Sequence, residues 1–192
     1  EEFNKKGIYF VALGGAEEVG FNMFAYIINQ KMIVVDAGYG FLQDDYPGME
    51  MGLADASFLE TYHDDIEAMF ITHGHEDHVG LFEYIPPYVP QYMSDGTKEL
   101  LLIKYRTLKE GVELSLAQLQ NDTNSIKEQI EEENFKKSNA ENKIKIIARM
   151  NSWGRTSPGK KPSPIFIGDI TITPFFNCHS IYDSHMFLIE AD

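Results

Sequence analysis

The segment Thr72-His73-Gly74-His75-Glu76-Asp77-His78 gathers three histidines and an aspartate within a short stretch of chain. Imidazole and carboxylate groups are ligands that zinc prefers in proteins. We expect His73 and His75 to hold one ion, and Asp77 and His78 to hold a second ion close by. Because two ions about 3.5–4 Å apart can clamp and activate one water molecule, the segment predicts a hydrolytic metal centre.

The residues around this motif indicate how it is positioned. Residues 68–72 are mostly apolar and predict a short buried strand that ends at the motif. Gly74 is expected to let the chain bend there, so that both neighbouring imidazoles can face one ion. Residues 79–84 are typical of the first turn of a helix, which puts Asp77 and His78 on the far side of the bend.

Strand and helix patterns both occur along the rest of the chain. A meander with a turn at residues 29–31, a short strand, a hairpin turning at Gly168-Asp169 and a last strand are predicted. These strands cover residues 8–13, 21–28, 32–36, 91–93, 165–167, 170–176 and 186–190.

Three segments favour helix and one favours an open loop. Residues 39–53 are rich in Gly, Asp and Pro and predict a loop, followed by a short helix over residues 54–62. Good helix formers dominate residues 98–109 and 115–147. We therefore expect residues 98–150 to form a long helical excursion or helical hairpin.

The composition restricts the kind of protein. At 192 residues and 43% hydrophobic content the chain can bury a core, and one domain is the default. No apolar run approaches the roughly 20 residues of a membrane-spanning helix, so no membrane association is expected. Cys178 is the single cysteine, which excludes an internal disulfide and fits a reducing cytoplasm.

The net charge of −14 is unevenly distributed. Residues 1–99 carry 18 acidic and 4 basic side chains, whereas residues 100–192 carry 12 of each. Within the second half, residues 143–161 hold six Lys or Arg residues, no acid and Trp153. Such a segment could contact phosphates and stack a base, or it could be a solvated loop beside a helix.

Several segments, in order, resemble the ribonuclease J branch of the metallo-β-lactamase superfamily, over residues 8–95 and 162–192. They are VALGG (11–15), EVGFN (18–22), IVVDAG (33–38), THGHEDH (72–78) and NCHS followed by DS (177–184). The resemblance implies that His179 completes the shell of the ion held by His73 and His75. It also makes Asp77 and His78 the catalytic pair on the second ion, and gives Asp36 a supporting role through hydrogen bonds.

The same resemblance implies an α+β fold, the metallo-β-lactamase αββα sandwich. Residues 1–192 would be the N-terminal part of that domain, a truncated half with a helical insertion at residues 98–150. Two zinc ions are expected in the full-length protein, with manganese as an alternative. The family needs a bridging aspartate and a further histidine that cannot be placed before Asp192, so the isolated chain should be inactive. A half-built sandwich leaves a strand edge uncovered, and homo-oligomers are therefore expected.

Three classes of function remain open. The first is a cytoplasmic ribonuclease J-like nuclease that cleaves phosphodiester bonds in RNA or single-stranded nucleic acid. The second is a small-molecule metallo-hydrolase of the lactonase or thioesterase type. The third is a non-catalytic binding protein of the same fold.

Overall fold

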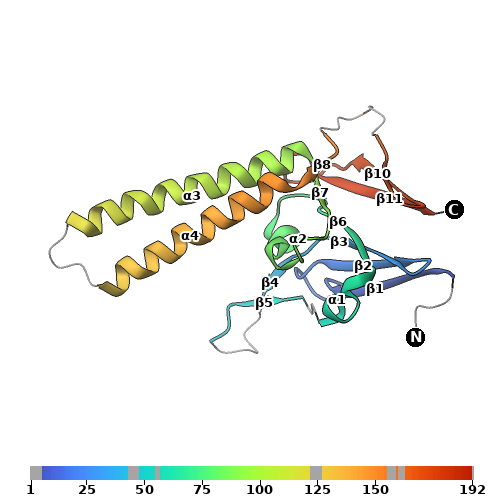
Figure 1. Ribbon diagram of the computed structural model, residues 1–192, viewed down its shortest axis with the longest axis horizontal. Coiled ribbons are helices and arrows are strands. Elements are labelled where there is room, and N and C mark those ends of the chain that lie inside the picture. Colours follow the sequence, from blue (N-terminus) through green and yellow to red (C-terminus); the bar gives the residue numbers. More distant parts are fainter. Residues whose placement is uncertain are drawn as a thin grey trace. The chain divides into compact units, whose positions relative to one another are not determined.

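The computed structural model describes residues 6–42, 48–54, 57–121, 127–154, 159 and 163–191 (Figure 1). The chain divides into two compact units. The first contains Glu1–Thr97 and Asn151–Asp192, and the second contains Lys98–Met150. The second unit spans the residues of the expected helical excursion, but its status as an insertion in a larger domain stays a prediction.

A six-stranded mixed sheet forms the centre of the first unit. Its strands lie in the order β1-β2-β3-β6-β7-β8. The first three are antiparallel neighbours, as the predicted meander requires, and β3, β6, β7 and β8 are parallel. The bounds are β1 (Ile8–Gly14), β2 (Met23–Ile28), β3 (Lys31–Val35), β6 (Ile66–Phe70), β7 (Gln91–Met93) and β8 (Asn151–Ser152).

A three-stranded antiparallel sheet packs face to face against this sheet. It contains β9 (Ile165–Ile167), β10 (Ile170–Phe176) and β11 (His185–Ala191), in the order β11-β10-β9. The core between the sheets joins Ile170 and Ile172 to a group from the larger sheet. That group is Ile28, Ile33, Val35, Ala68 and Phe70. The predicted hairpin is confirmed, and its turn carries Gly168 with a positive φ of 63°.

The opposite face of the six-stranded sheet is also buried. Met23, Ala25 and Ile27 alternate along β2 with the residues that face the other sheet, and all three are buried. Short helical segments supply Leu59, Val79 and other buried apolar side chains on that side. These segments are α1 (Ser57–Thr61), the 3-10 turn His63–Asp65, α2 (Glu76–Val79) and the 3-10 turn Phe82–Tyr84.

The expectation of an open loop over residues 39–53 was wrong at both ends of that range. β4 (Tyr39–Phe41) and β5 (Met51–Leu53) pair with each other as a two-stranded sheet. The ring of Phe21 fills the space beside Gly40 and Gly52, so the two glycines let this pair pack closely on the chain before β2. Residues 43–47 lie outside the described part of the chain.

Two long helices build the second unit: α3 (Asp95–Asn121), which starts in the first unit, and α4 (Lys127–Arg149) (Figure 1). Ion pairs of 3.2 Å between Lys109 and Glu141, and of 2.9 Å between Lys137 and Glu113, join them. The expectation of separate helices over residues 98–109 and 115–147 was wrong at their junction, because α3 continues through Gly111. This glycine is exposed, and glycine there costs about 1 kcal/mol. α3 ends at Asn121 and α4 begins at Lys127, and residues 122–126 lie outside the described part of the chain.

None of the helices among the described residues is long and apolar enough to cross a membrane.

Candidate metal centre

Three histidines from two distant segments of the first unit converge on one point. One ring nitrogen from each of His73, His75 and His179 lies within 4.8 Å of the other two. His73 Nε2 and His75 Nδ1 face each other at 3.2 Å. The ring of His179 stands edge-on to both, at centroid distances of 4.7 and 5.0 Å. Three nitrogen donors with this spacing match the protein ligand set of a catalytic zinc site, so the residues fit the expected ion.

Each of these histidines lies just after a strand or in a turn whose position the sheets fix. His73 follows β6, and His75 is the residue just before α2. His179 lies in the turn between β10 and β11, which is closed by a 2.8 Å hydrogen bond from Asn177 N–H to the Ser184 carbonyl. A 3.0 Å hydrogen bond from His185 N–H to the Thr72 carbonyl then ties that turn to the end of β6.

The environment favours neutral imidazoles in this cluster. Burial, reinforced by the neighbouring histidines, lowers the pKa of His73 to about 3. Burial and the proximity of His179 also lower the pKa of His75. Because a metal binds the unprotonated ring, a proton is a weak competitor for His73 at neutral pH.

A hydrogen-bond chain fixes which nitrogen of His73 is available. Thr72 Oγ1 donates to Asp36, at 2.8 Å from Oδ2. With its single proton used there, the Thr72 hydroxyl accepts from His73 Nδ1–H at 2.8 Å. His73 Nε2 is therefore left with its lone pair toward the cluster.

Asp36 connects this cluster to His78. Its carboxylate is 2% exposed and accepts hydrogen bonds from Thr72 N–H at 2.8 Å and from His78 Nδ1–H at 2.7 Å. Burial raises the pKa of Asp36, against the hydrogen bonds from His78 and Thr72, which lower it. For His78, burial opposes protonation, but the hydrogen bond and charge of Asp36 outweigh it and raise the pKa.

Asp77 and His78 form a second, smaller group beside the first. His78 Nε2 lies 3.5 Å from Asp77 Oδ2, and the ring of His78 is 4.0 Å from that of His73. Asn22 Nδ2 lies 3.2 Å from both Asp77 Oδ2 and His78 Nε2, and 3.0 Å from the Asp77 carbonyl oxygen. In the sequence, Asn22 and Thr72 stand out only as members of the motifs EVGFN and THGHEDH, and nothing beside them indicates which groups they bond.

Gly38 is the glycine that this centre requires. A Cβ at Gly38 would overlap the carbonyl group of Asp77, because the loop after β3 runs directly against α2. Gly74 has no positive φ, and a Cβ there would make only ordinary contacts with Ile181 and Thr97. The expectation that Gly74 permits the bend is therefore wrong.

Other candidate residues do not belong to the three-histidine cluster. Ser184 and His185 are buried, whereas Cys178 is exposed and lies between β10 and β11. Trp153 is 5.4 Å from the ring of Phe187 and 5.3 Å from that of His185, so it packs in an aromatic cluster of the core and is no platform for a base. Of the six basic residues near it, Lys143, Lys145 and Arg149 lie on α4, and the other three lie outside the described residues.

Comparisons with known proteins bear on what this centre belongs to. The chain is 35% identical to ribonuclease J of Mycobacterium tuberculosis over 104 residues, which is 54% of this chain and 19% of that protein. It is 33% identical to ribonuclease J2 of Bacillus subtilis over 109 residues, or 56% of this chain and 19% of that protein. Over about half its length, the chain resembles the ribonuclease J branch of the metallo-β-lactamase superfamily. It spans about a fifth of the length of these curated relatives.

Two further findings complete the comparison. No protein-family model matches the chain. A crystal structure of a protein of unknown function from Enterococcus faecalis aligns with 96% of this chain and 41% of its own, with a TM-score of 0.56 and 20% identity. That similarity shows a shared fold.

Proposed function

We propose that the chain is part of a metal-dependent hydrolase, a ribonuclease J-like nuclease that cleaves phosphodiester bonds in RNA. The observation that carries this proposal is the convergence of His73, His75 and His179 at the end of a strand, in a chain whose named relatives are ribonucleases. RNA is the substrate by analogy with those names, and a cytoplasmic location agrees with the single cysteine.

In this proposal His73, His75 and His179 hold one zinc ion, and Asp77 and His78 contribute to a second. Zinc bound there supplies Lewis acidity and a water of lowered pKa. Asp36 and Thr72 fix the rings of His73 and His78 with their Nε2 atoms toward the centre. The partly exposed Asp77 carboxylate, held by Asn22, accepts a hydrogen bond from the attacking water and orients it.

We also propose that residues 1–192 are the N-terminal part of a metallo-β-lactamase domain that residues 98–150 interrupt. Exposed Phe166, Met186 and Leu188 on the three-stranded sheet support this, since apolar side chains in a row usually face a partner surface, be it further chain or a second copy. Asp77 and His78 supply only two donors, fewer than the three protein ligands usual at catalytic zinc. The chain alone should therefore turn over poorly.

A small-molecule metallo-hydrolase is the second candidate, and one observation favours it. A cavity of about 620 Å³ beside Asp77 is lined by Glu17, Glu18 and Glu76 as well as by apolar side chains. Those carboxylates would repel a polyanion, whereas a neutral or cationic substrate would not be repelled.

The test begins with metal content. Zinc and manganese per chain should be measured by elemental analysis for the wild type, His73→Ala and His63→Ala, the last being an exposed histidine outside the cluster. We expect about one ion per wild-type chain, retained in His63→Ala and lost in His73→Ala. Equal metal content in all three proteins would contradict the proposed centre.

The second stage separates the functions. The full-length protein would be assayed on 5′-phosphorylated single-stranded RNA and on lactone and thioester substrates. RNA cleavage that His73→Ala abolishes supports the nuclease. Turnover of the lactone and thioester substrates alone supports the second candidate. Stoichiometric metal without any turnover supports a non-catalytic binding protein of the same fold.

A further inference from the structure

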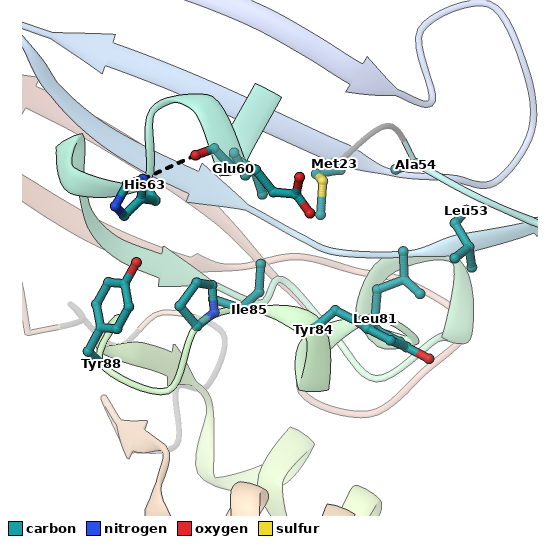
Figure 2. Close-up of a pocket in the computed structure, with 11 residues that line it drawn as sticks. Met23, Leu53, Ala54, Glu60, His63, Leu81, Tyr84, Ile85 and Tyr88 are labelled. Carbon is teal, nitrogen blue, oxygen red and sulfur yellow. Dashed lines mark hydrogen bonds between the residues drawn. The ribbon is translucent and has the colours of Figure 1, made fainter. Parts of the chain in front are cut away.

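A second cavity, of about 450 Å³, lies on the helix side of the six-stranded sheet (Figure 2). It shares no lining residue with the histidine cluster or with the acidic cavity beside Asp77. β2, the end of β5, α1 and the segment 81–88 enclose it. The lining residues are Met23, Leu53, Ala54, Leu59, Glu60, His63, Leu81, Tyr84, Ile85, Pro86 and Tyr88.

The floor of this cavity is apolar. Met23, Ala54, Leu59, Leu81 and Ile85 line it, and each is buried. A mostly apolar cavity of this volume, with a few polar groups at its edge, is typical of small-molecule sites. The floor can therefore hold the hydrocarbon part of a ligand.

Polar and aromatic groups form the mouth. Tyr84 and Tyr88 are 68% and 62% exposed, and the Tyr88 hydroxyl points toward the ring of His63 (Figure 2). The His63 ring is held by its Nδ1, 3.1 Å from the Glu60 carbonyl, and its Nε2, 3.1 Å from Asp64 Oδ1. The Glu60 carboxylate extends over the cavity toward Met23 and forms no ion pair among the residues that the structure describes (Figure 2).

The segment that supplies most of the lining carries side-chain charges of one sign. From Met32 to Thr97 the sequence contains 13 Asp and Glu residues and no Lys or Arg. Every lining residue except Met23 belongs to that stretch. An anionic ligand would be repelled by the Glu60 carboxylate at the mouth, whereas a cation would be attracted. Exposed tyrosine rings add to this preference, because a cation is attracted to an aromatic face.

We propose that this cavity binds a small organic cation, an amine with an aromatic or branched aliphatic body. The apolar body fills the floor over Leu59 and Ile85. The ammonium group lies at the mouth, paired with the Glu60 carboxylate and close to the tyrosine rings. This site is independent of the proposed hydrolase function, because no residue of the metal centre takes part.

The experiment compares three probes of similar size and different charge on the 192-residue chain. They are 2-phenylethylamine, 2-phenylethanol and 3-phenylpropionate, titrated by calorimetry or by NMR. The amine should bind at least about fivefold more tightly than the alcohol, and the carboxylate should bind most weakly. Equal affinity for amine and alcohol, or no binding of the amine at millimolar concentration, would overturn the proposal.

Variants locate the site. Glu60→Gln should remove the preference for the amine, and Tyr88→Leu should weaken amine binding by about threefold. Both positions are exposed, so neither change should disturb the fold. Glu67→Gln, at an exposed position of β6 outside the lining, is the matched control and should bind like the wild type. An equal loss in Glu67→Gln, or no loss in Glu60→Gln, would refute the assignment.

The metal centre provides the last control. His73→Ala should bind the amine as the wild type does, whatever its metal content. Loss of amine binding in that variant would place the probe at the histidine cluster and contradict the proposal.

Discussion

His73 and His78 lie with ring centroids only 4.0 Å apart, yet their surroundings act on them in opposite ways. His73 donates to a hydroxyl and faces other imidazoles, and burial lowers its pKa to about 3. His78 donates to a buried carboxylate, and Asp36 raises its pKa. The first is prepared to bind a cation without losing a proton, whereas the second keeps its proton up to a higher pH. A single motif can therefore contain two histidines that differ in how easily a metal ion displaces the proton.

The His73 and His78 parts of the motif both depend on the backbone contact between Gly38 and Asp77. Breaking this contact should have the largest effect on stability. Gly38→Ala places a Cβ into the Asp77 carbonyl, so the loop and α2 must separate. We expect a loss of about 3 kcal/mol or more in the free energy of unfolding, measured by urea denaturation. Gly74→Ala is the matched control and should cost less than about 1 kcal/mol. Similar losses in both would mean that the two loops do not pack as described.

Zinc affinity tests whether His73 and His78 differ in their contribution to metal binding. His73→Ala should lower zinc affinity about 100-fold or more, because it removes one of three converging nitrogens. His78→Ala should leave the first ion bound with nearly unchanged affinity. Isothermal titration with zinc and a competing chelator measures both. If His78→Ala weakens the first ion as much as His73→Ala does, the two groups act as one site.

Asp36 is the group that makes His78 different. Asp36→Asn keeps the size of the side chain but loses the charge that His78 and Thr72 are bonded to. We expect a destabilisation of about 2 kcal/mol in urea denaturation of the metal-free chain. Asp169→Asn, in the exposed ion pair with Lys31, should cost less than about 1 kcal/mol. An equally small cost for Asp36→Asn would contradict its supporting role.

The contributions of His73 and His78 to folding stability should depend on pH with opposite signs. The unfolded His73 binds a proton near its ordinary pKa of 6.5 and the folded one near 3, so its contribution to stability falls as pH drops through this range. The slope is up to about 1.4 kcal/mol per pH unit. His78 contributes stability below pH 6.5 and loses it as pH rises through its raised pKa.

Urea denaturation in the presence of a chelator measures this dependence. Going from pH 7 to pH 5, the wild type should lose more stability than His73→Gln. Between pH 6 and pH 8, the wild type should lose more stability than His78→Gln. Parallel curves for the wild type and the two variants would refute the opposite assignments.

Asn22 should have the smallest effect, because its contacts are partly exposed. Asn22→Ala removes the amide that bridges Asp77 and His78. We expect a cost of about 1 kcal/mol in urea denaturation, and no change in the first zinc ion. Asn151→Ala, an exposed asparagine of β8, should be neutral. A loss of the first ion in Asn22→Ala would show that Asn22 supports both groups.

The sequence predicted the parts of the molecule that local patterns govern. Apolar segments identified β1, β2, β3, β9 and β10 within one or two residues, and the α+β fold is confirmed. β2 starts two residues later than expected because Phe21 adopts a positive φ of 58°. Such a backbone conformation depends on packing against Gly40 and Gly52, which are distant in sequence.

The convergence of the histidines could be expected only in part. His73 and His75 are neighbours in sequence, but His179 was assigned from the resemblance, and its ligand role remains a prediction. Its approach depends on contacts across the fold, such as the 2.9 Å hydrogen bond from Gly96 N–H to Asp183. No sequence pattern around Gly96 or Asp183 indicates that these two residues contact each other. The same holds for Asn22, whose partners lie at Asp77 and His78.

The pairing of β7 with β8 limits how the helical unit could be engineered. The two strands are parallel neighbours, with Tyr92 opposite Asn151 and Met93 opposite Ser152. A parallel connection must carry the chain back along the full length of the strands, which takes a dozen residues or more. Residues 98–150 could thus be shortened to a single crossover helix, whereas a tight turn in their place would force β8 to reverse direction or leave the sheet.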